Sequence, residues 1–163
     1  MKALVLYRSF YGNTRRVAEA MGRQIDAQGN ESVVQDVRQR LPDLKGIDLV
    51  LIGAPTRMAR VNLRAIGVLG RLRRGGLGDK PVVVFDTYGP LPKRPEEMDE
   101  ARKWYIPGAA GILQNAGRKR GLNVHPEALR CEVREMKGPL ADGQEEKAVA
   151  FVKQILATVG KKR

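Results

Sequence analysis

The residues best suited to chemistry in this sequence form one polar loop, Ser9-Phe10-Tyr11-Gly12-Asn13-Thr14. The loop follows a run of apolar residues and precedes a pattern typical of a helix. At the start of a helix, free backbone N–H groups and the positive end of the helix dipole attract anions. The hydroxyls of Ser9 and Thr14 add hydrogen-bonding groups, and Gly12 lets the backbone approach a ligand closely. The loop therefore predicts a phosphate site, against the alternative of an ordinary turn between a strand and a helix.

The patterns that the chain lacks narrow the kind of phosphate. Neither the GxxxxGK[ST] pattern nor the dinucleotide pattern GxGxxG occurs at this turn. A phosphate bound without an obligatory lysine suits FMN better than a nucleoside triphosphate. The sequence nominates no metal site and no catalytic side chain of the protein, because His125 and Cys131 are each the only residue of their type, and we interpret both as structural.

The pattern of apolar residues predicts the elements that must hold this loop. Continuous apolar runs, typical of parallel strands covered on both faces, occur at residues 3–7, 49–52 and 82–85. More polar runs at residues 32–37 and 128–133 predict strands at the edges of the sheet. Helical patterns between the strands imply crossover connections and helices on both faces. We therefore expect a three-layer α/β/α sandwich with a five-stranded parallel sheet in the order 2-1-3-4-5.

The length of 163 residues fits a single domain spanning residues 1–163. Its last helix is expected to begin near Asp142, because Asp142 and Glu145 have the spacing of a capping box. Residues 86–107, rich in proline and charge, are expected to be irregular. The aromatic pair Trp104 and Tyr105 ends this stretch, either as an anchor for a surface loop or as a lid over the site.

Two more segments follow predicted central strands, Gly53-Ala54-Pro55-Thr56-Arg57-Met58 after the third and Thr87-Tyr88-Gly89 after the fourth. The carboxyl ends of parallel strands meet at one edge of a sheet, where ligands bind at the switch point of the topology. We therefore expect both segments to lie beside the phosphate loop. Tyr88 is either a stacking platform for a ring or an ordinary loop tyrosine.

These loops resemble those of a known family. Ser9 to Thr14 is similar to the flavodoxin phosphate loop, and Tyr11 in place of the usual threonine resembles the flavodoxin-like NAD(P)H:quinone oxidoreductases. Gly53 to Arg57 is similar to the Gly-x-Pro-Thr-Arg segment of those reductases, which runs along the isoalloxazine edge. The resemblance implies a flavodoxin-like fold with bound FMN. It assigns the phosphate to Ser9, Phe10, Tyr11, Gly12, Asn13 and Thr14, and the ring to Pro55, Thr56, Arg57, Met58, Thr87, Tyr88 and Gly89.

The chain also departs from the reductase pattern. Met58, Ala59 and Arg60 stand where the reductases usually carry a glycine, and Thr87-Tyr88-Gly89-Pro90 lacks their histidine and paired glycines. The flavin is thus predicted more firmly than its reaction. We leave open whether the chain is an enzyme that reduces a quinone or similar acceptor with NAD(P)H, an electron carrier, or a cofactor-free binding module with an anionic partner.

The formal net charge is +12, and residues 49–78 contain no acidic residue. An arginine cluster within that stretch is either the solvated face of a helix or a docking site for an anionic partner, such as NAD(P)H or an acidic redox protein; its members are Arg57, Arg60, Arg64, Arg71, Arg73 and Arg74. Aromatic residues make up only 5% of the chain, and no recognition motif singles out nucleic acid. The apolar run at residues 3–7 is too short for a signal peptide or a membrane span. This short run and the lone cysteine favour a cytoplasmic protein. The sequence leaves the oligomeric state open, between a monomer and an oligomer such as a dimer.

Overall fold

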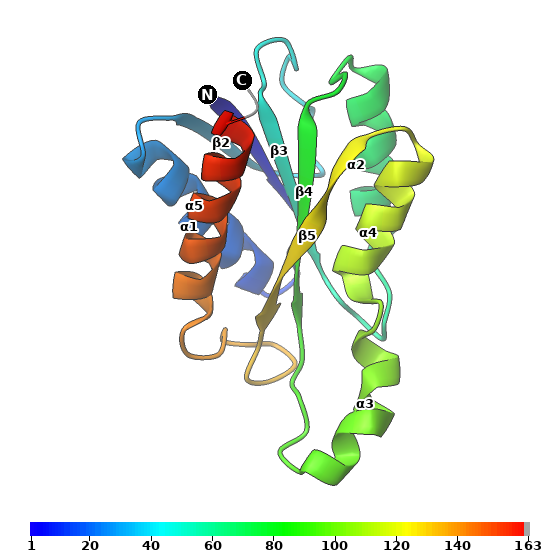
Figure 1. Ribbon diagram of the computed structural model, residues 1–163. Coiled ribbons are helices and arrows are strands. Elements are labelled where there is room, and N and C mark those ends of the chain that lie inside the picture. The colour runs from blue at the N-terminus through cyan, green and yellow to red at the C-terminus, as the bar shows by residue number, and fades with distance from the viewer. Residues whose placement is uncertain (162–163) are drawn as a thin grey trace.

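The computed structural model describes residues 1–161, and it contains a parallel sheet with helices on both faces (Figure 1). The strands are β1 (Lys2–Tyr7), β2 (Glu31–Asp36), β3 (Leu49–Pro55), β4 (Pro81–Tyr88) and β5 (Asn123–Glu132). The helices are α1 (Asn13–Ala27), α2 (Leu63–Arg74), α3 (Met98–Tyr105), α4 (Gly108–Lys119) and α5 (Gln144–Lys161), with a short 3-10 helix η1 (Pro95–Glu97) ahead of α3.

The strand order is β2-β1-β3-β4-β5, and every neighbouring pair is parallel. This order confirms the predicted order 2-1-3-4-5 and places the two more polar strands, β2 and β5, at the edges. The three central strands contain the continuous apolar runs of residues 3–6, 49–52 and 82–85, which are buried because helices cover both faces of the sheet.

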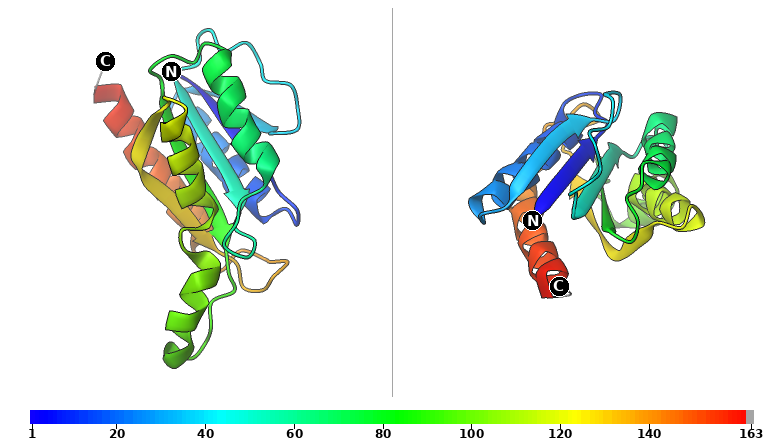
Figure 2. Two further views of the ribbon diagram at one scale, coloured as in Figure 1. Left: turned by 90° about the vertical axis from the view of Figure 1, so that its right-hand side faces the viewer. Right: turned by 90° about the horizontal axis from the view of Figure 1, so that it is seen from above.

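Alternate residues of each central strand enter opposite hydrophobic layers. Leu4 and Leu6 pack with the apolar faces of α2 and α4, whereas Ala3 and Val5 pack with those of α1 and α5. Figure 2 shows the two helix pairs on either side of the sheet. Cys131 is buried in the α1–α5 layer, and burial raises the pKa of its thiol to about 12. The thiol is therefore protonated and packed, as its place in the edge strand predicts.

The prediction of an irregular stretch over residues 86–107 was wrong in part. Strand β4 continues through Tyr88, and η1 and α3 occupy residues 95–105. Local signals explain the helix: a proline at the first position of η1, acidic residues in the first turn, and the ion pairs Asp99–Arg102 and Glu100–Lys103 at i,i+3 spacing. In Figure 2, α3 extends beyond the carboxyl end of the sheet.

Two smaller expectations also need correction. Helix α5 begins at Gln144, and the predicted capping box does not form, since the Asp142 carboxylate contacts Arg134 and Glu145 accepts a hydrogen bond from Arg16 of α1. Strand β5 begins at Asn123, earlier than expected, with a register shift opposite residues 82–84 of β4. None of the described helices is both long and apolar enough to cross a membrane.

Candidate functional site

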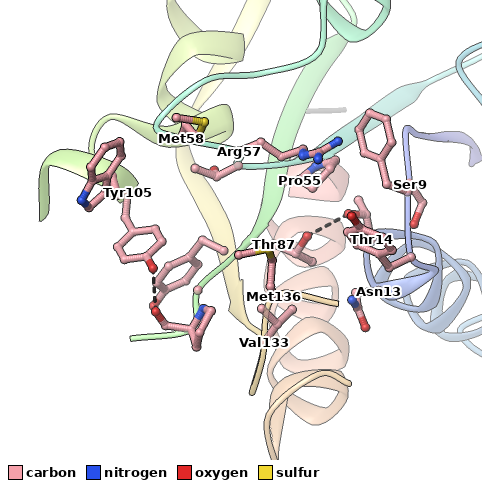
Figure 3. A pocket seen from close by; sticks show the side chains of 17 residues that line it. Ser9, Asn13, Thr14, Pro55, Arg57, Met58, Thr87, Tyr105, Val133 and Met136 are labelled. Atoms are coloured by element: carbon pink, nitrogen blue, oxygen red, sulfur yellow. Dashed lines mark hydrogen bonds between the residues drawn. The ribbon is translucent and has the colours of Figure 1, made fainter. Parts of the chain in front are cut away.

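An open cavity of about 500 Å³ lies at the carboxyl ends of β1, β3 and β4 (Figure 3). The three loops predicted from the sequence come together around it. Its lining includes every predicted site residue except Gly12, namely Ser9, Phe10, Tyr11, Asn13, Thr14, Pro55, Thr56, Arg57, Met58, Thr87, Tyr88 and Gly89. Gly12 lines an adjoining groove with Lys137 and Gly138. The remaining cavity wall consists of Pro90, Trp104, Tyr105, Val133 and Met136.

The loop between β1 and α1 leaves backbone donors available at the start of α1. Gly12 caps the helix in the left-handed conformation, with φ of 89°, and no side chain caps its first turn. The first intrahelical bond runs from Arg16 N to Gly12 O, so the amides of Asn13 and Thr14 have no partner within the helix. The Ser9 hydroxyl accepts a hydrogen bond from Gly12 N at 3.0 Å. The loop thus combines free N–H groups, a hydroxyl and the positive end of a helix dipole.

Side-chain contacts tie this loop to the rest of the cavity. The hydroxyls of Thr14 and Thr87 are hydrogen-bonded at 2.8 Å, which joins α1 to the end of β4 (Figure 3). Asn13 Nδ2 donates to the backbone oxygen of Lys137 at 3.2 Å. The Lys137 ammonium also lies 5.8 Å from the centre of the Tyr11 ring. The segment after β5, which the sequence did not assign to the site, therefore borders the predicted phosphate loop.

A tight turn at residues 57–60 forms the rim of the cavity after β3. Arg57 and Arg60 exchange two backbone hydrogen bonds, of 3.0 and 2.9 Å, across Met58 and Ala59. Both central residues have positive φ, 51° for Met58 and 61° for Ala59, as a type I′ turn requires. The Ala59 amide donates to the Trp104 backbone oxygen at 2.7 Å, so the turn is attached to the end of α3. A glycine or asparagine is the usual occupant of such positions, and neither is present here.

Aromatic side chains from β4 and α3 form one wall of the cavity. The rings of Tyr88 and Tyr105 meet edge to face, with centres 5.8 Å apart. The Tyr105 hydroxyl donates to the Pro90 backbone oxygen at 2.6 Å (Figure 3). Partial burial raises the pKa of both phenols, so both stay protonated at neutral pH. Trp104 and Tyr105, whose role the sequence left undecided, thus belong to the cavity wall.

A buried ion pair beneath this wall escaped the sequence analysis. Asp86 of β4 is fully buried, and its carboxylate accepts hydrogen bonds from the Arg130 guanidinium at 2.9 to 3.1 Å. The same carboxylate accepts from the Thr56 hydroxyl at 2.8 Å and from the amide of Ala110 at 3.1 Å. Thr56 in turn accepts from the amide of Ala109 at 2.7 Å. These bonds connect the ends of β3, β4 and β5 to the first turn of α4.

A family model described as a flavodoxin domain matches residues 4–115, which is more than half of the chain. The chain belongs to the flavodoxin family. This membership gives the protein FMN as its cofactor and electron transfer as its role. The residues that contact FMN, and the likeness to the quinone oxidoreductases, stay predictions.

Solved structures share the fold of this flavodoxin over nearly its whole length. A flavodoxin from the domain Archaea is 22% identical with a TM-score of 0.70, and the match covers 98% of this chain and 99% of that chain. Flavodoxin 1 from Bacillus cereus is also 22% identical, with a TM-score of 0.70 and coverage of 96% and 98%. Rubredoxin oxygen:oxidoreductase from Desulfovibrio gigas is 14% identical with a TM-score of 0.68, and the match covers 99% of this chain but 36% of that chain. The same fold therefore also occurs within a longer chain.

The cavity of this flavodoxin fits FMN. An apolar, partly aromatic space of about 500 Å³ suits the flat ring, and the uncapped start of α1 suits the phosphate. Arg8, directly before the phosphate loop, adds a buried Nε–H group that has no hydrogen-bond partner among the described residues. Its guanidinium lies 4.2 Å from the centre of the Phe10 ring, and that of Arg57 lies 4.6 Å from the same centre. The site is thus positively charged, which favours a phosphate and a reduced, anionic flavin.

The arginine cluster expected from the sequence is divided by the fold. Arg57, Arg60 and Arg64 lie at the cavity end, where α2 begins. Arg73 and Arg74 lie in the last turn of α2, about 15 Å further along a helix that rises 1.5 Å per residue. Only the first group can therefore meet a partner that docks at the cavity.

Proposed function

We propose that this flavodoxin takes electrons from an anionic donor, an acidic redox protein in the first place and NAD(P)H in the second. It passes them to a quinone or a similar acceptor. The observation that carries the proposal is the surface around the cavity mouth, where exposed apolar side chains stand among arginines and lysines.

FMN, when bound, supplies the one- and two-electron chemistry. The residues of the chain bind and orient it: Ser9 to Thr14 hold the phosphate, while Pro55 to Met58 and Thr87 to Gly89 hold the ring. The Thr14–Thr87 hydrogen bond keeps the phosphate loop and one ring loop at a fixed separation. The apolar and aromatic wall limits the access of water to the ring. Arg57, at the rim, orients a positive charge toward the cofactor site.

All the large hydrophobic side chains that are exposed among the described residues belong to the loops and helix ends at the cavity end of the sheet. They are Phe10, Tyr11, Met58, Leu63, Trp104, Ile106 and Met136. Leu63 and Ile106 are 80% and 60% exposed and do not line the cavity, so FMN would leave both uncovered. Exposed apolar groups gathered at one place mark an interaction surface.

The composition of this surface favours a protein partner. Methionine, tryptophan and arginine are enriched in protein interfaces, and Met58, Trp104 and Arg60 lie close together at the 57–60 turn and the end of α3. The acidic residues of α3 pair with cations of the same helix, so they do not offset the charge of the rim. An acidic protein would be steered to such a surface, and its binding would weaken with salt.

The donor is tested by anaerobic stopped-flow reduction of the FMN-loaded protein with a reduced, acidic plant-type ferredoxin. The variant Arg60→Gln/Arg64→Gln should lower the second-order rate constant about tenfold at low ionic strength, because it removes two steering charges. The matched control Arg73→Gln/Arg74→Gln removes the same charge from the far end of α2 and should leave the rate nearly unchanged. Equal effects of both pairs would show that net charge, not this rim, governs the encounter. Faster bleaching with NADPH than with ferredoxin would place NAD(P)H first.

The acceptor is tested by mixing the same reduced protein with 1,4-benzoquinone and following reoxidation of the flavin. A flat quinone can approach the exposed side chains of Met58 and Trp104 at the mouth of the cavity that FMN fills. We expect the quinone to reoxidise the protein faster than dissolved oxygen does at equal concentration. Slower reoxidation by the quinone would leave a protein acceptor as the remaining candidate.

A further inference from the structure

We propose that Arg130 is a positioning residue for the flavin ring, which it serves by holding the Tyr88 side chain from behind. The proposal rests on the proposed function, since it requires the ring to lie against Tyr88. Nothing in the motifs of the chain points to Arg130, which lies 44 residues after its ion-pair partner Asp86.

The Arg130 guanidinium lies over the ring of Tyr88. The guanidinium carbon lies 4.4 Å from the centre of the ring, a distance at which a planar cation stacks on an aromatic face. Tyr88 lines the cavity, whereas Arg130 does not. The guanidinium therefore covers the side of the ring that faces away from the cavity, and Tyr105 contacts the ring edge.

Arg130 is itself fixed. Its Nε and Nη2 atoms donate to both oxygens of the buried Asp86 carboxylate in a fork geometry that lysine cannot reproduce. Gly108 leaves the space for this arrangement, because a Cβ atom on it would lie 2.3 Å from Arg130 Nη2. The φ of 67° at Gly108 also favours glycine. The guanidinium is thus held in one place, and the ring stacked on it has one orientation.

The consequence for the cofactor is a preformed contact. A tyrosine that is free to rotate loses side-chain freedom when a ligand orders it, and the loss weakens binding. A Tyr88 ring already held by Arg130 and Tyr105 avoids that loss. Arg130 thereby contributes to ring binding without touching the ring, whereas the phosphate contacts do not depend on it.

Titration of the apoprotein with FMN and with riboflavin, followed by flavin fluorescence, tests this role. Arg130→Lys keeps the charge opposite Asp86 but removes the planar stack, and it should weaken FMN binding about fivefold. Riboflavin, which has the same ring and no phosphate, should lose the same factor. The matched control Arg134→Lys changes an exposed arginine beyond the end of β5 and should bind FMN as the unmodified protein does.

A double-mutant cycle separates positioning through Tyr88 from a general structural effect. In the Tyr88→Ala background, Arg130→Lys should change FMN affinity less than about twofold, because the residue through which it acts is gone. The near-ultraviolet circular dichroism of the apoprotein should also lose tyrosine signal in Arg130→Lys, with no cofactor present. If Arg130→Lys does not fold, Asp86→Asn/Arg130→Gln removes both charges together, and it should show the same loss for both flavins.

Three results would overturn the proposal. The first is FMN affinity in Arg130→Lys equal to that of the unmodified protein, and the second is an equal loss in both backgrounds of the cycle. In either case the protein still binds FMN, so the proposed function stands and only the role of Arg130 fails. The third is an unmodified protein that binds neither FMN nor riboflavin, which overturns the proposed function as well.

Discussion

Arg57 shows how one side chain at the cavity rim can influence a cofactor. Its guanidinium lies over the Phe10 ring together with that of Arg8, so two cations are kept beside the phosphate loop. The carboxylates of Asp86 and Asp36 form ion pairs with other arginines, Arg130 and Arg38 respectively. A positive charge at the rim stabilises a flavin that becomes negative on reduction.

Replacing Arg57 with alanine should lower the two-electron midpoint potential of the bound FMN by about 30 mV, the equivalent of about 1.4 kcal/mol. The measurement is anaerobic spectroelectrochemical titration of the loaded protein. Arg57→Lys, which retains the charge, should keep most of the original potential. A midpoint that stays the same in Arg57→Ala would rule out this electrostatic role.

At the scale of structural elements, the residues of the 57–60 turn are poorly suited to the backbone conformation that they adopt. Met58 and Ala59 both adopt positive φ, which costs side-chain-bearing residues roughly 1–2 kcal/mol each. The turn persists because Arg57 and Arg60 pair across it and because Trp104 accepts the Ala59 amide. Local strain of this kind gathers at functional sites, where the surrounding structure imposes it.

Ala59→Gly should therefore raise the free energy of unfolding of the apoprotein by about 0.5–1 kcal/mol, since glycine adopts positive φ without a steric cost. Urea denaturation measures the change. The same substitution at Ala157, exposed in α5, should lower the free energy of unfolding by about 1 kcal/mol. A loss of stability at both positions would mean that positive φ at Ala59 carries no strain.

At the scale of the whole molecule, the net charge of +12 makes the folded chain repel itself. Sodium chloride should therefore raise the free energy of unfolding of the apoprotein by screening this repulsion. Inorganic phosphate at equal ionic strength should stabilise it further, by about 1.4 kcal/mol when phosphate is about tenfold above its dissociation constant. Urea denaturation in the two salts measures the difference.

FMN-loaded protein serves as the control for this comparison. The cofactor phosphate occupies the phosphate loop of this form, so inorganic phosphate should no longer raise its free energy of unfolding more than chloride does. An equal effect of both salts on the apoprotein would indicate that screening alone acts and that the loop between β1 and α1 binds no free phosphate.

The sequence predicted the parts of this site that depend on local pattern. Apolar runs identify the central strands, and parallel strands bring the Ser9, Pro55 and Thr87 loops to one edge of the sheet whatever the details of packing. It could not predict the Asp86–Arg130 pair, because the two residues meet only through the β4–β5 register. The sequence could not decide the role of Trp104 for a similar reason, because its position depends on the hydrogen bond that its backbone oxygen accepts from the distant Ala59 amide.

The attachment of α4 to Asp86 has a consequence for how this fold can diversify. The chain leaves the sheet after Tyr88 and enters α4 at Gly108, where Thr56 and Asp86 accept hydrogen bonds from the first turn of the helix. Both ends of the intervening segment are therefore anchored independently of its content. We therefore expect that natural variation or protein engineering within residues 91–103, which excludes the contacts of Pro90, Trp104 and Tyr105, can alter partner choice while the sheet keeps its frame.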